Sequence, residues 1–176
     1  MQIIDNFLSE DQFKGIQSYM MSPNFPWYFI NGVVYLDDPK DYQFTHVFYH
    51  AQRVHSKSFK EHEPFNEERV RSIEYFSCAE PCLDALGARN IYRVKANLNP
   101  RTVFHRKGGY HVDYDHHDKK TAILYINTCN GYTQFKSSGK VKSVANRMVI
   151  FNSTQEHQGV TCTDEKRRVM INFNYS

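Results

Sequence analysis

Residues 168–175 read Arg-Val-Met-Ile-Asn-Phe-Asn-Tyr, with apolar side chains at every second position. Successive side chains of a β-strand point to opposite faces, so this stretch predicts a strand with one apolar face and one mostly polar face. The apolar face consists of Val169, Ile171, Phe173 and Tyr175, and the other face of Arg168, Met170, Asn172 and Asn174. The apolar face is expected to pack on a core, whereas the polar face either meets water or lines a cavity.

Arg168 has the clearest chemistry on this strand. If the polar face lines a cavity, the planar guanidinium group is suited to bind a carboxylate through two parallel hydrogen bonds. Arg167, one position away, points to the opposite face. In the apolar stretch 121–127, the same alternation places Tyr125 on one face with Thr121, so the Tyr125 hydroxyl could bind the same anion.

The second half of the chain contains other short stretches of this kind. They are residues 90–98, 121–127, 132–136 and 147–151, and turn sequences such as Lys107-Gly-Gly109 and Asn130-Gly131 separate them. Many short strands with such turns are typical of an antiparallel sandwich or jelly roll. The sequence therefore predicts a mainly β protein with flanking helices.

Residues 1–89 are expected to support that core with helices and a hairpin. Ser9-Glu-Asp-Gln12 is a capping box and predicts a helix over residues 9–21. Residues 27–36 place Asn31-Gly32 between two aromatic and β-branched runs, which predicts a β-hairpin. A second helical stretch, near residues 66–87, should be kinked or divided by Pro81, and Gly87 is a candidate for its end. Because no linker or repeat is evident, residues 1–176 are interpreted as one domain with its core in 90–176.

The composition excludes several classes of protein. With 176 residues, 40% of them hydrophobic and 23% charged, the chain is too apolar for disorder and too charged for a membrane span. Its four cysteines form no CxxC motif, which favours reduced thiols and a cytoplasmic protein. The first residues contain neither a basic region nor a long apolar run, so neither a secretion signal nor a membrane anchor is predicted. A net charge of +3 does not favour nucleic acid as a partner.

Two His-x-Asp pairs stand close together, and each could clasp a metal ion from one face of a strand. The second pair, His116-His-Asp118, is followed by two lysines in a polar stretch that reads as an exposed loop. The first, His111-Val-Asp113, precedes the apolar stretch 121–127 by one loop and is therefore the better metal candidate. The intervening loop, residues 114–120, has only the Tyr114 ring as an apolar anchor and is expected to be mobile and to gate the site.

A facial triad of two histidines and one carboxylate holds Fe(II) and leaves three adjacent coordination positions open. The second histidine must then come from a distant strand. His157 is the candidate, because it follows the predicted strand 147–151 in a polar segment. Considered alone, a single histidine of this kind more often has a structural role.

In order and spacing, these residues resemble the 2-oxoglutarate and Fe(II)-dependent dioxygenases of the prolyl hydroxylase type, including small members from phage and bacteria. The resemblance covers about residues 90–176. It rests on His111-x-Asp113, Leu124-Tyr-Ile-Asn127, Gly131-Tyr-Thr-Gln-Phe135, Asn146-Arg-Met-Val-Ile-Phe151, His157 and Arg168-x-x-Ile-x-Phe-x-Tyr175. It implies a distorted double-stranded β-helix, a cupin-like jelly roll with helices supporting one sheet.

The resemblance also implies roles for individual residues. His111, Asp113 and His157 would be catalytic as the iron ligands, while Arg168 and Tyr125 would bind 2-oxoglutarate. Position 99, where relatives often carry a tyrosine that contacts the cosubstrate, is Asn99 and is not counted as a binding residue. The implied reaction consumes O₂ and 2-oxoglutarate, releases succinate and CO₂, and hydroxylates a C–H bond, with ascorbate as a reductant. Halogenating relatives lack the carboxylate ligand, so that a halide can bind the iron in its place. The presence of Asp113 therefore favours hydroxylation.

Two other functions stay open. Nucleic-acid N-demethylases of the same superfamily usually carry a second arginine six positions after the first, and here that position is Asn174. A non-catalytic jelly-roll module with a structural metal would differ from an enzyme in having no 2-oxoglutarate turnover. The sequence does not name the prime substrate: a prolyl residue in a peptide, a free amino acid and another small molecule all remain candidates.

Overall fold

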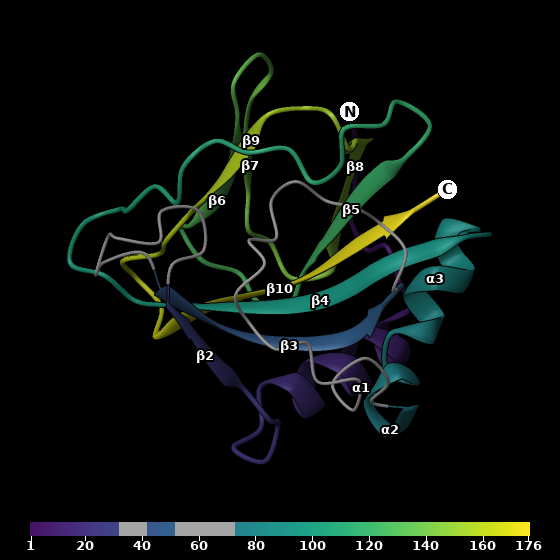
Figure 1. Ribbon diagram of the computed structural model, residues 1–176. Helices are drawn as coiled ribbons and strands as arrows, with labels where there is room; N and C mark the ends of the chain where they lie inside the picture. The colour runs from purple at the N-terminus through teal and green to yellow at the C-terminus, as the bar shows by residue number, and fades with distance from the viewer. Residues whose placement is uncertain (32–41, 52–72) are drawn as a thin grey trace.

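The computed structural model of the protein describes residues 1–31, 42–51 and 73–176. Within these ranges a seven-stranded sheet, in the order β1-β8-β5-β10-β4-β3-β2, faces a three-stranded sheet, in the order β7-β6-β9 (Figure 1). Neighbouring strands pair antiparallel in both sheets. The fold is a distorted double-stranded β-helix, the jelly roll that the sequence resemblance implied.

The described strands and helices have the following bounds. The strands are β1 (Gln2–Ile4), β2 (Tyr28–Asn31), β3 (Tyr42–His50), β4 (Ile91–Pro100), β5 (Lys120–Tyr125), β6 (Tyr132–Phe135), β7 (Gly139–Lys142), β8 (Arg147–Asn152), β9 (His157–Val160) and β10 (Arg167–Tyr175). The helices are α1 (Glu10–Met20), α2 (Ile73–Phe76) and α3 (Glu80–Leu86). Strands therefore occupy all five stretches that the alternation pattern predicted in residues 90–176.

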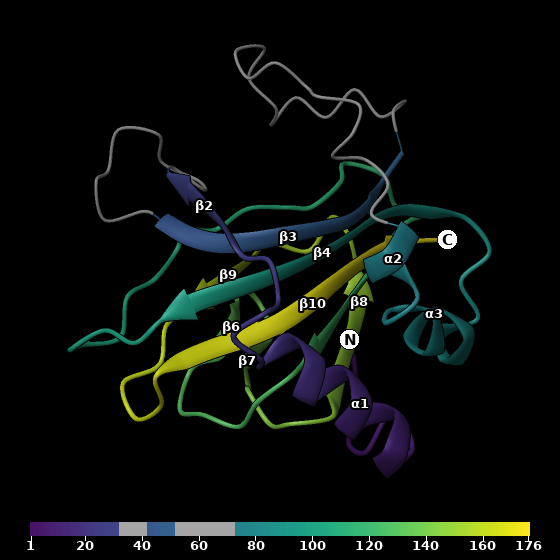
Figure 2. The same ribbon diagram turned by 90° about the horizontal axis from the view of Figure 1, so that it is seen from below.

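Helix α1 begins where the capping box predicts. The Ser9 Oγ accepts a hydrogen bond from the backbone N of Gln12 at 3.4 Å, which satisfies one of the free donors of the first turn. Phe13, Ile16 and Met20 are buried on the side of the helix that packs on the large sheet. Helices α1, α2 and α3 lie on one face of this sheet, away from the three-stranded sheet (Figure 2). None of the helices in the described ranges has the length and apolar character needed to cross a membrane.

The two faces of β10 belong to two different layers, as its alternation predicts. Val169, Ile171, Phe173 and Tyr175 join the core between the large sheet and the helices. Met170 belongs instead to a smaller cluster between the two sheets, with Ile123 and Tyr125 from β5 and Phe135 from β6. The polar face of β10 is therefore directed into the jelly roll and not toward bulk water.

The helical stretch before β4 is divided, as expected. The chain leaves helical geometry after α2, and Pro81 lies in the first turn of α3, where its missing N–H costs no hydrogen bond. Gly87 ends α3 in a left-handed conformation with φ +62°. The part of the predicted stretch from 66 to 72 lies outside the described residues.

Strand β2 forms an antiparallel pair with β3, in which Asn31 lies opposite Tyr42. The second strand that the Asn31-Gly32 motif predicted, residues 33–36, lies outside the described residues. Strand β3 itself was not predicted. Its residues Phe44, His46 and Phe48 face the helices, but the residues between them include Val47, so the strand lacks a regular apolar and polar alternation.

Candidate metal and cosubstrate site

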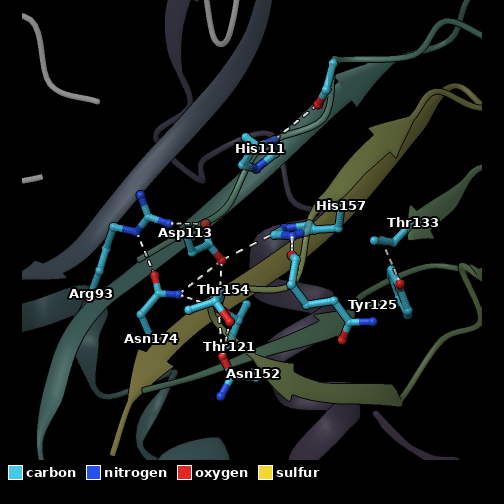
Figure 3. Close-up of polar contacts among 12 residues, drawn as sticks. Arg93, His111, Asp113, Thr121, Tyr125, Thr133, Asn152, Thr154, His157 and Asn174 are labelled. Carbon is cyan, nitrogen blue, oxygen red and sulfur yellow. Dashed lines mark hydrogen bonds and ion pairs between the residues drawn. The ribbon is translucent and has the colours of Figure 1, made fainter. Parts of the chain in front are cut away.

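Backbone pairing brings the three predicted ligands together. The backbone N of His111 donates to the O of His157 at 3.0 Å, and the reverse bond has the same length. The backbone N of Asp113 donates to the O of Ser153 at 3.1 Å, which fixes the His-x-Asp segment against the β8–β9 connection. The possible ligand atoms of His111, Asp113 and His157 all lie within 4.8 Å of one another (Figure 3).

Both histidine rings are oriented by backbone carbonyls. The Nδ1 atom of His111 lies 3.2 Å from the O of Gly109, and the Nδ1 atom of His157 lies 3.0 Å from the O of Gln155 (Figure 3). A carbonyl oxygen can only accept, so Nδ1 carries the proton in each ring and the Nε2 lone pair is available. A carbonyl that fixes the tautomer in this way is typical of metal-binding histidines.

The surroundings of His157 favour its neutral form. The edge of the Phe151 ring packs against it with centroids 4.8 Å apart, and Phe135 lies on the same side. Burial lowers the pKa of His157, and this effect exceeds the opposing attraction of Asp113. A buried neutral imidazole is the form that can bind a metal.

Asp113 is held by three donors in a buried position. Its Oδ1 accepts from Nη2 of Arg93 at 2.9 Å, and its Oδ2 accepts from Oγ1 of Thr121 at 2.8 Å and from Nδ2 of Asn174 at 3.1 Å. Burial by itself would raise the pKa of Asp113, but Arg93 and the two histidines hold the pKa well below its usual range. The carboxylate is therefore charged, with Oδ2 3.9 Å from Nε2 of His157.

Sequence reasoning missed the supporting role of these three donors. Asn174 also donates to Oγ1 of Thr121 at 2.9 Å and accepts from Nε of Arg93 at 2.9 Å, so the donors form one network (Figure 3). The polar faces of β5 and β10 were evident in the sequence. Their convergence on Asp113 follows from strand register, in which Asn174 lies opposite Arg93 on β4 and Thr121 on β5.

The second His-x-Asp pair stays outside the site, as expected. The side chains of His116 and Asp118 are exposed. The Tyr114 ring is buried as the expected apolar anchor of the loop that carries them, and the structure adds polar anchors. Lys119 is buried, with its Nζ 4.3 Å from the centroid of the Tyr92 ring and 4.7 Å from that of Tyr114. Ser153 adds hydrogen bonds to the loop backbone at Tyr114, His116 and Lys119.

Arg168 belongs to a second polar cluster of the inner face and is fully buried. Its Nε donates to Oγ of Ser143 at 2.7 Å and its Nη2 donates to Oγ1 of Thr133 at 3.0 Å. Tyr125 donates its hydroxyl to the same Thr133 oxygen at 2.8 Å, and its ring centroid lies 5.4 Å from Cζ of Arg168. The structure thus brings Arg168 and Tyr125 together, as the alternation pattern predicted.

One nitrogen of the Arg168 guanidinium group makes no hydrogen bond to the described residues. Among the described residues, Nη1 of Arg168 is buried and has no hydrogen-bond partner. A buried, unpaired donor on a charged group is costly, so this atom is suited to an anionic ligand. Two glycines line the side chain: a Cβ at Gly131 would lie 2.6 Å from Cδ of Arg168, and one at Gly159 would lie 3.6 Å from Nη1.

Arg167 and Asn99, the neighbours of Arg168 along β10 and across to β4, make hydrogen bonds elsewhere. Arg167 points to the opposite face, where its Nη2 donates to the O of Met21 at 2.6 Å and ties the end of α1 to the sheet. Asn99 lies opposite Arg168 on β4 and donates to Oε1 of Gln43 at 3.4 Å. Neither contact competes for the free Nη1 atom.

A second group of potential ligands consists of Cys129, Cys162 and Asp164. Both carboxylate oxygens of Asp164 accept from the backbone N of Asn130, at 3.0 and 2.9 Å. The Sγ of Cys162 donates to the O of Glu165, and burial raises the pKa of this thiol to about 11. These contacts describe a polar cluster that joins two loops beside Arg168 and in which the Cys162 thiol stays protonated.

Known structures share this fold over nearly the whole chain, although no protein-family model and no curated protein sequence matches it. A prolyl-4-hydroxylase of Pseudomonas putida has a TM-score of 0.59 and 14% identity, covering 99% of this chain and 92% of that one. A Trichoplax adhaerens prolyl hydroxylase, in complex with a hypoxia-inducible-factor peptide, has a TM-score of 0.59 and 16% identity, covering 99% and 82%. A non-heme alpha-ketoglutarate-dependent epimerase of nogalamycin biosynthesis has a TM-score of 0.58 and 8% identity, covering 99% and 76%.

These likenesses define the class of fold. The chain shares its architecture with two prolyl hydroxylases and an alpha-ketoglutarate-dependent epimerase, and it combines that architecture with a His-Asp-His group of potential metal ligands.

Proposed function

We propose that the protein is a 2-oxoglutarate- and Fe(II)-dependent dioxygenase that hydroxylates a C–H bond. The observation that carries the proposal is the arrangement of the inner face of β10. Asn174, near the end of the strand, supports the His111-Asp113-His157 group. Arg168, near its start, offers a buried guanidinium nitrogen that has no partner among the described residues. A metal ion at one end and a cationic donor at the other are what a dicarboxylate cosubstrate needs.

The donor set fits Fe(II). His111 and His157 present their Nε2 atoms and Asp113 presents a charged oxygen, which is the ligand set of non-heme Fe(II) oxygenases. Three ligands on one side would leave three coordination positions for cosubstrate and O₂. Bound Fe(II) would supply the activation of O₂ that couples decarboxylation of 2-oxoglutarate to hydroxylation, with ascorbate keeping the metal reduced.

The residues of the chain bind, orient and shield the reactants in this proposal. Arg168 pairs with the distal carboxylate of 2-oxoglutarate, while Thr133 and Tyr125 hold the guanidinium group in place. Phe151 and Phe135 exclude water from the back of His157. The overall reaction balances as R–H + 2-oxoglutarate + O₂ giving R–OH + succinate + CO₂.

A prolyl residue in a peptide is one candidate for the hydroxylated group, because the Trichoplax neighbour was solved with a peptide. Free amino acids and other small molecules are the remaining candidates for a cytoplasmic enzyme of this class. The N-demethylase alternative has less support, because Asn174 is engaged with Asp113, Thr121 and Arg93. The non-catalytic jelly-roll module is the second alternative.

The test is release of succinate and CO₂ from 2-oxoglutarate with Fe(II) and ascorbate. Proline-containing peptides, free proline and small carboxylic acids serve as the panel of prime substrates. The proposal expects turnover that is stimulated by at least one of them and is lost in His157→Ala. Metal binding by the intact His-Asp-His group without turnover under any condition would instead favour the binding module.

A further inference from the structure

The inner face of β4 carries a row of polar side chains. Val94, Ala96 and Leu98 pack in the core beneath the helices, so the alternate residues point the other way, into the jelly roll. They are Arg93, Lys95, Asn97 and Asn99. Two of them have been described: Arg93 binds Asp113, and Asn99 lies opposite Arg168. Lys95 and Asn97 lie between these positions and have no part in either pocket.

Among the described residues, Lys95 has no counter-ion of its own. On the neighbouring strands it lies opposite Asn172 of β10 and Val47 of β3, neither of which is acidic. In the described part of the chain its Nζ makes no hydrogen bond or ion pair, although the residue is half-buried. An ammonium group withdrawn from water without an anion is an unfavourable arrangement unless a ligand supplies the anion.

The charges around Lys95 leave an excess of positive charge. Burial first and Arg93 second lower the pKa of Lys95 to about 8, against the attraction of Asp113, so the side chain is still mostly protonated at neutral pH. Burial first, and then Arg93 and Lys95, lower the pKa of His50 as well, so the positive charge of these two side chains also acts on the end of β3. A divalent metal on Asp113 would increase the positive charge further.

Two buried amide oxygens lie next to Lys95. Within the described ranges, Oδ1 of Asn97 and Oδ1 of Asn172 are buried and have no hydrogen-bond partner. Asn97 is two positions from Lys95 on the same face of β4, and Asn172 is its cross-strand neighbour. Free acceptors beside an unpaired ammonium group are suited to a ligand that brings both an anion and an N–H or O–H group.

This cluster is separate from the cosubstrate pocket. Lys95 is four positions from Asn99, which lies opposite Arg168, and at 3.3 Å per residue that spacing is about 13 Å. It is only two positions from Arg93, which touches Asp113. Lys95 therefore lies at the metal end of the inner face, beside the position of the reacting substrate.

We propose that Lys95, with Asn97 and Asn172, forms a subsite for a carboxylate of the prime substrate, so that the enzyme acts on anionic compounds in preference to their neutral analogues. The inference rests on the proposed function, because it assigns the substrate class of the same cavity. The carboxylate belongs either to the end of a free amino acid or to an acidic side chain of a peptide. Both sources offer the same chemistry to the ammonium group.

The test uses the whole protein loaded with Mn(II), which takes the same ligands as Fe(II) without oxygen chemistry. With 2-oxoglutarate present, paramagnetic broadening of probe proton signals gives the affinity of probes that bind beside the metal. N-acetyl-proline is compared with N-acetyl-prolinamide for the terminal carboxylate, and acetyl-Asp-Pro-amide with acetyl-Asn-Pro-amide for the side-chain carboxylate. The variants are Lys95→Met, Lys95→Gln and Lys95→Arg, and the exposed Lys142→Met is the matched control.

At least one carboxylate probe should bind about tenfold more tightly than its amide partner in the natural protein and in Lys142→Met. The preference should vanish in Lys95→Met and Lys95→Gln and persist in Lys95→Arg, and the pair that shows it identifies the source of the carboxylate. Equal affinity within both pairs, or a preference that survives Lys95→Gln, would overturn the inference. So would a Lys95 variant that weakens 2-oxoglutarate binding instead. A Lys95-dependent preference in a protein that never turns over 2-oxoglutarate would retain the subsite and refute the proposed activity.

Discussion

The two ends of the inner face of β10 differ in how completely their polar groups are satisfied. Near Asn174, the Asp113 carboxylate accepts three hydrogen bonds, and Asn174 makes bonds to three neighbouring side chains. Near Arg168, a fully buried guanidinium group keeps one nitrogen without a partner in the described structure. The difference distinguishes a group that is already fixed in place from a group that still needs a ligand. We interpret the first end as a preformed metal site and the second as the receptor for an anion.

Removing the Asp113 carboxylate should have the largest effect on metal binding, turnover and stability. Asp113→Ala would abolish Mn(II) binding and turnover, and it would also leave the Arg93 guanidinium without its counter-ion. Breaking a buried ion pair from one side costs about 3 to 5 kcal/mol, so the free energy of unfolding should fall by that amount. Isothermal titration with Mn(II) and denaturant unfolding measure the two effects. Asp118→Ala, on an exposed residue of the nearby loop, should change neither.

Arg168→Ala should affect the other end alone. Truncating one partner of a buried charged pair costs roughly 2 to 5 kcal/mol, which corresponds to an increase of about 30-fold or more in the 2-oxoglutarate concentration required. Mn(II) affinity should change little, because the metal ligands lie at the opposite end of the cavity. Steady-state kinetics over a range of 2-oxoglutarate concentrations checks this.

Arg167→Ala is the matched control for Arg168. It removes the hydrogen bond to the O of Met21, so it should lower stability by about 1 kcal/mol and leave the 2-oxoglutarate requirement unchanged. If Arg167→Ala weakened 2-oxoglutarate use and Arg168→Ala did not, the assignment of the two faces of β10 would be wrong.

Gly131→Ala should disturb the anion pocket by crowding it. The added Cβ would lie 2.6 Å from Cδ of Arg168 and 3.0 Å from the O of Val160, so the arginine must move. Overpacking of this kind costs about 1 to 3 kcal/mol, and the 2-oxoglutarate requirement should rise about tenfold. Gly15→Ala, in the middle of α1 with open space around its Cβ, should leave the kinetics unchanged and stabilise the helix by about 0.5 to 1 kcal/mol. A Gly131→Ala enzyme with ordinary cosubstrate kinetics would argue against Arg168 as the anion receptor.

Thr133→Val should have the smallest effect. The hydroxyl of Thr133 accepts from both Arg168 and Tyr125, and valine keeps the shape while removing the acceptor. The two donors would lose part of their orientation, and a few-fold rise in the 2-oxoglutarate requirement is expected, since a net hydrogen bond is worth about 1 kcal/mol. An effect on Mn(II) binding as large as that on 2-oxoglutarate would show that the two ends are not independent.

The sequence was informative where local pattern determines structure. The alternation of residues 168–175 correctly assigned both faces of β10, and the capping box correctly placed the start of α1. Strand β3 has no regular alternation, because Val47 follows His46, so local pattern does not predict it. Strand β9 reads His-Gln-Gly-Val, and these residues have too little β propensity for a strand to be predicted from them. The strand forms because it pairs with β6.

The candidate site needed information that local patterns do not contain. The alternation pattern could place Arg168 and Tyr125 on inward faces, but it could not show that Arg93 of β4 would bind Asp113. That contact depends on the register of β4 against β10, which packing of the whole sheet determines. The burial of Lys119 against two tyrosine rings could not be predicted either. One of these rings, Tyr92, comes from the distant strand β4, and the local sequence of a polar loop does not indicate such a partner.

A crystal structure of the protein with Mn(II) and 2-oxoglutarate, grown without oxygen, tests the central claim most directly. The account predicts one metal ion bound by Nε2 of His111, Nε2 of His157 and Oδ2 of Asp113. It predicts the distal carboxylate of 2-oxoglutarate on Nη1 of Arg168 at about 2.7 to 2.9 Å. A metal ion bound elsewhere, or a 2-oxoglutarate molecule whose distal carboxylate leaves Nη1 of Arg168 unpaired, would contradict it.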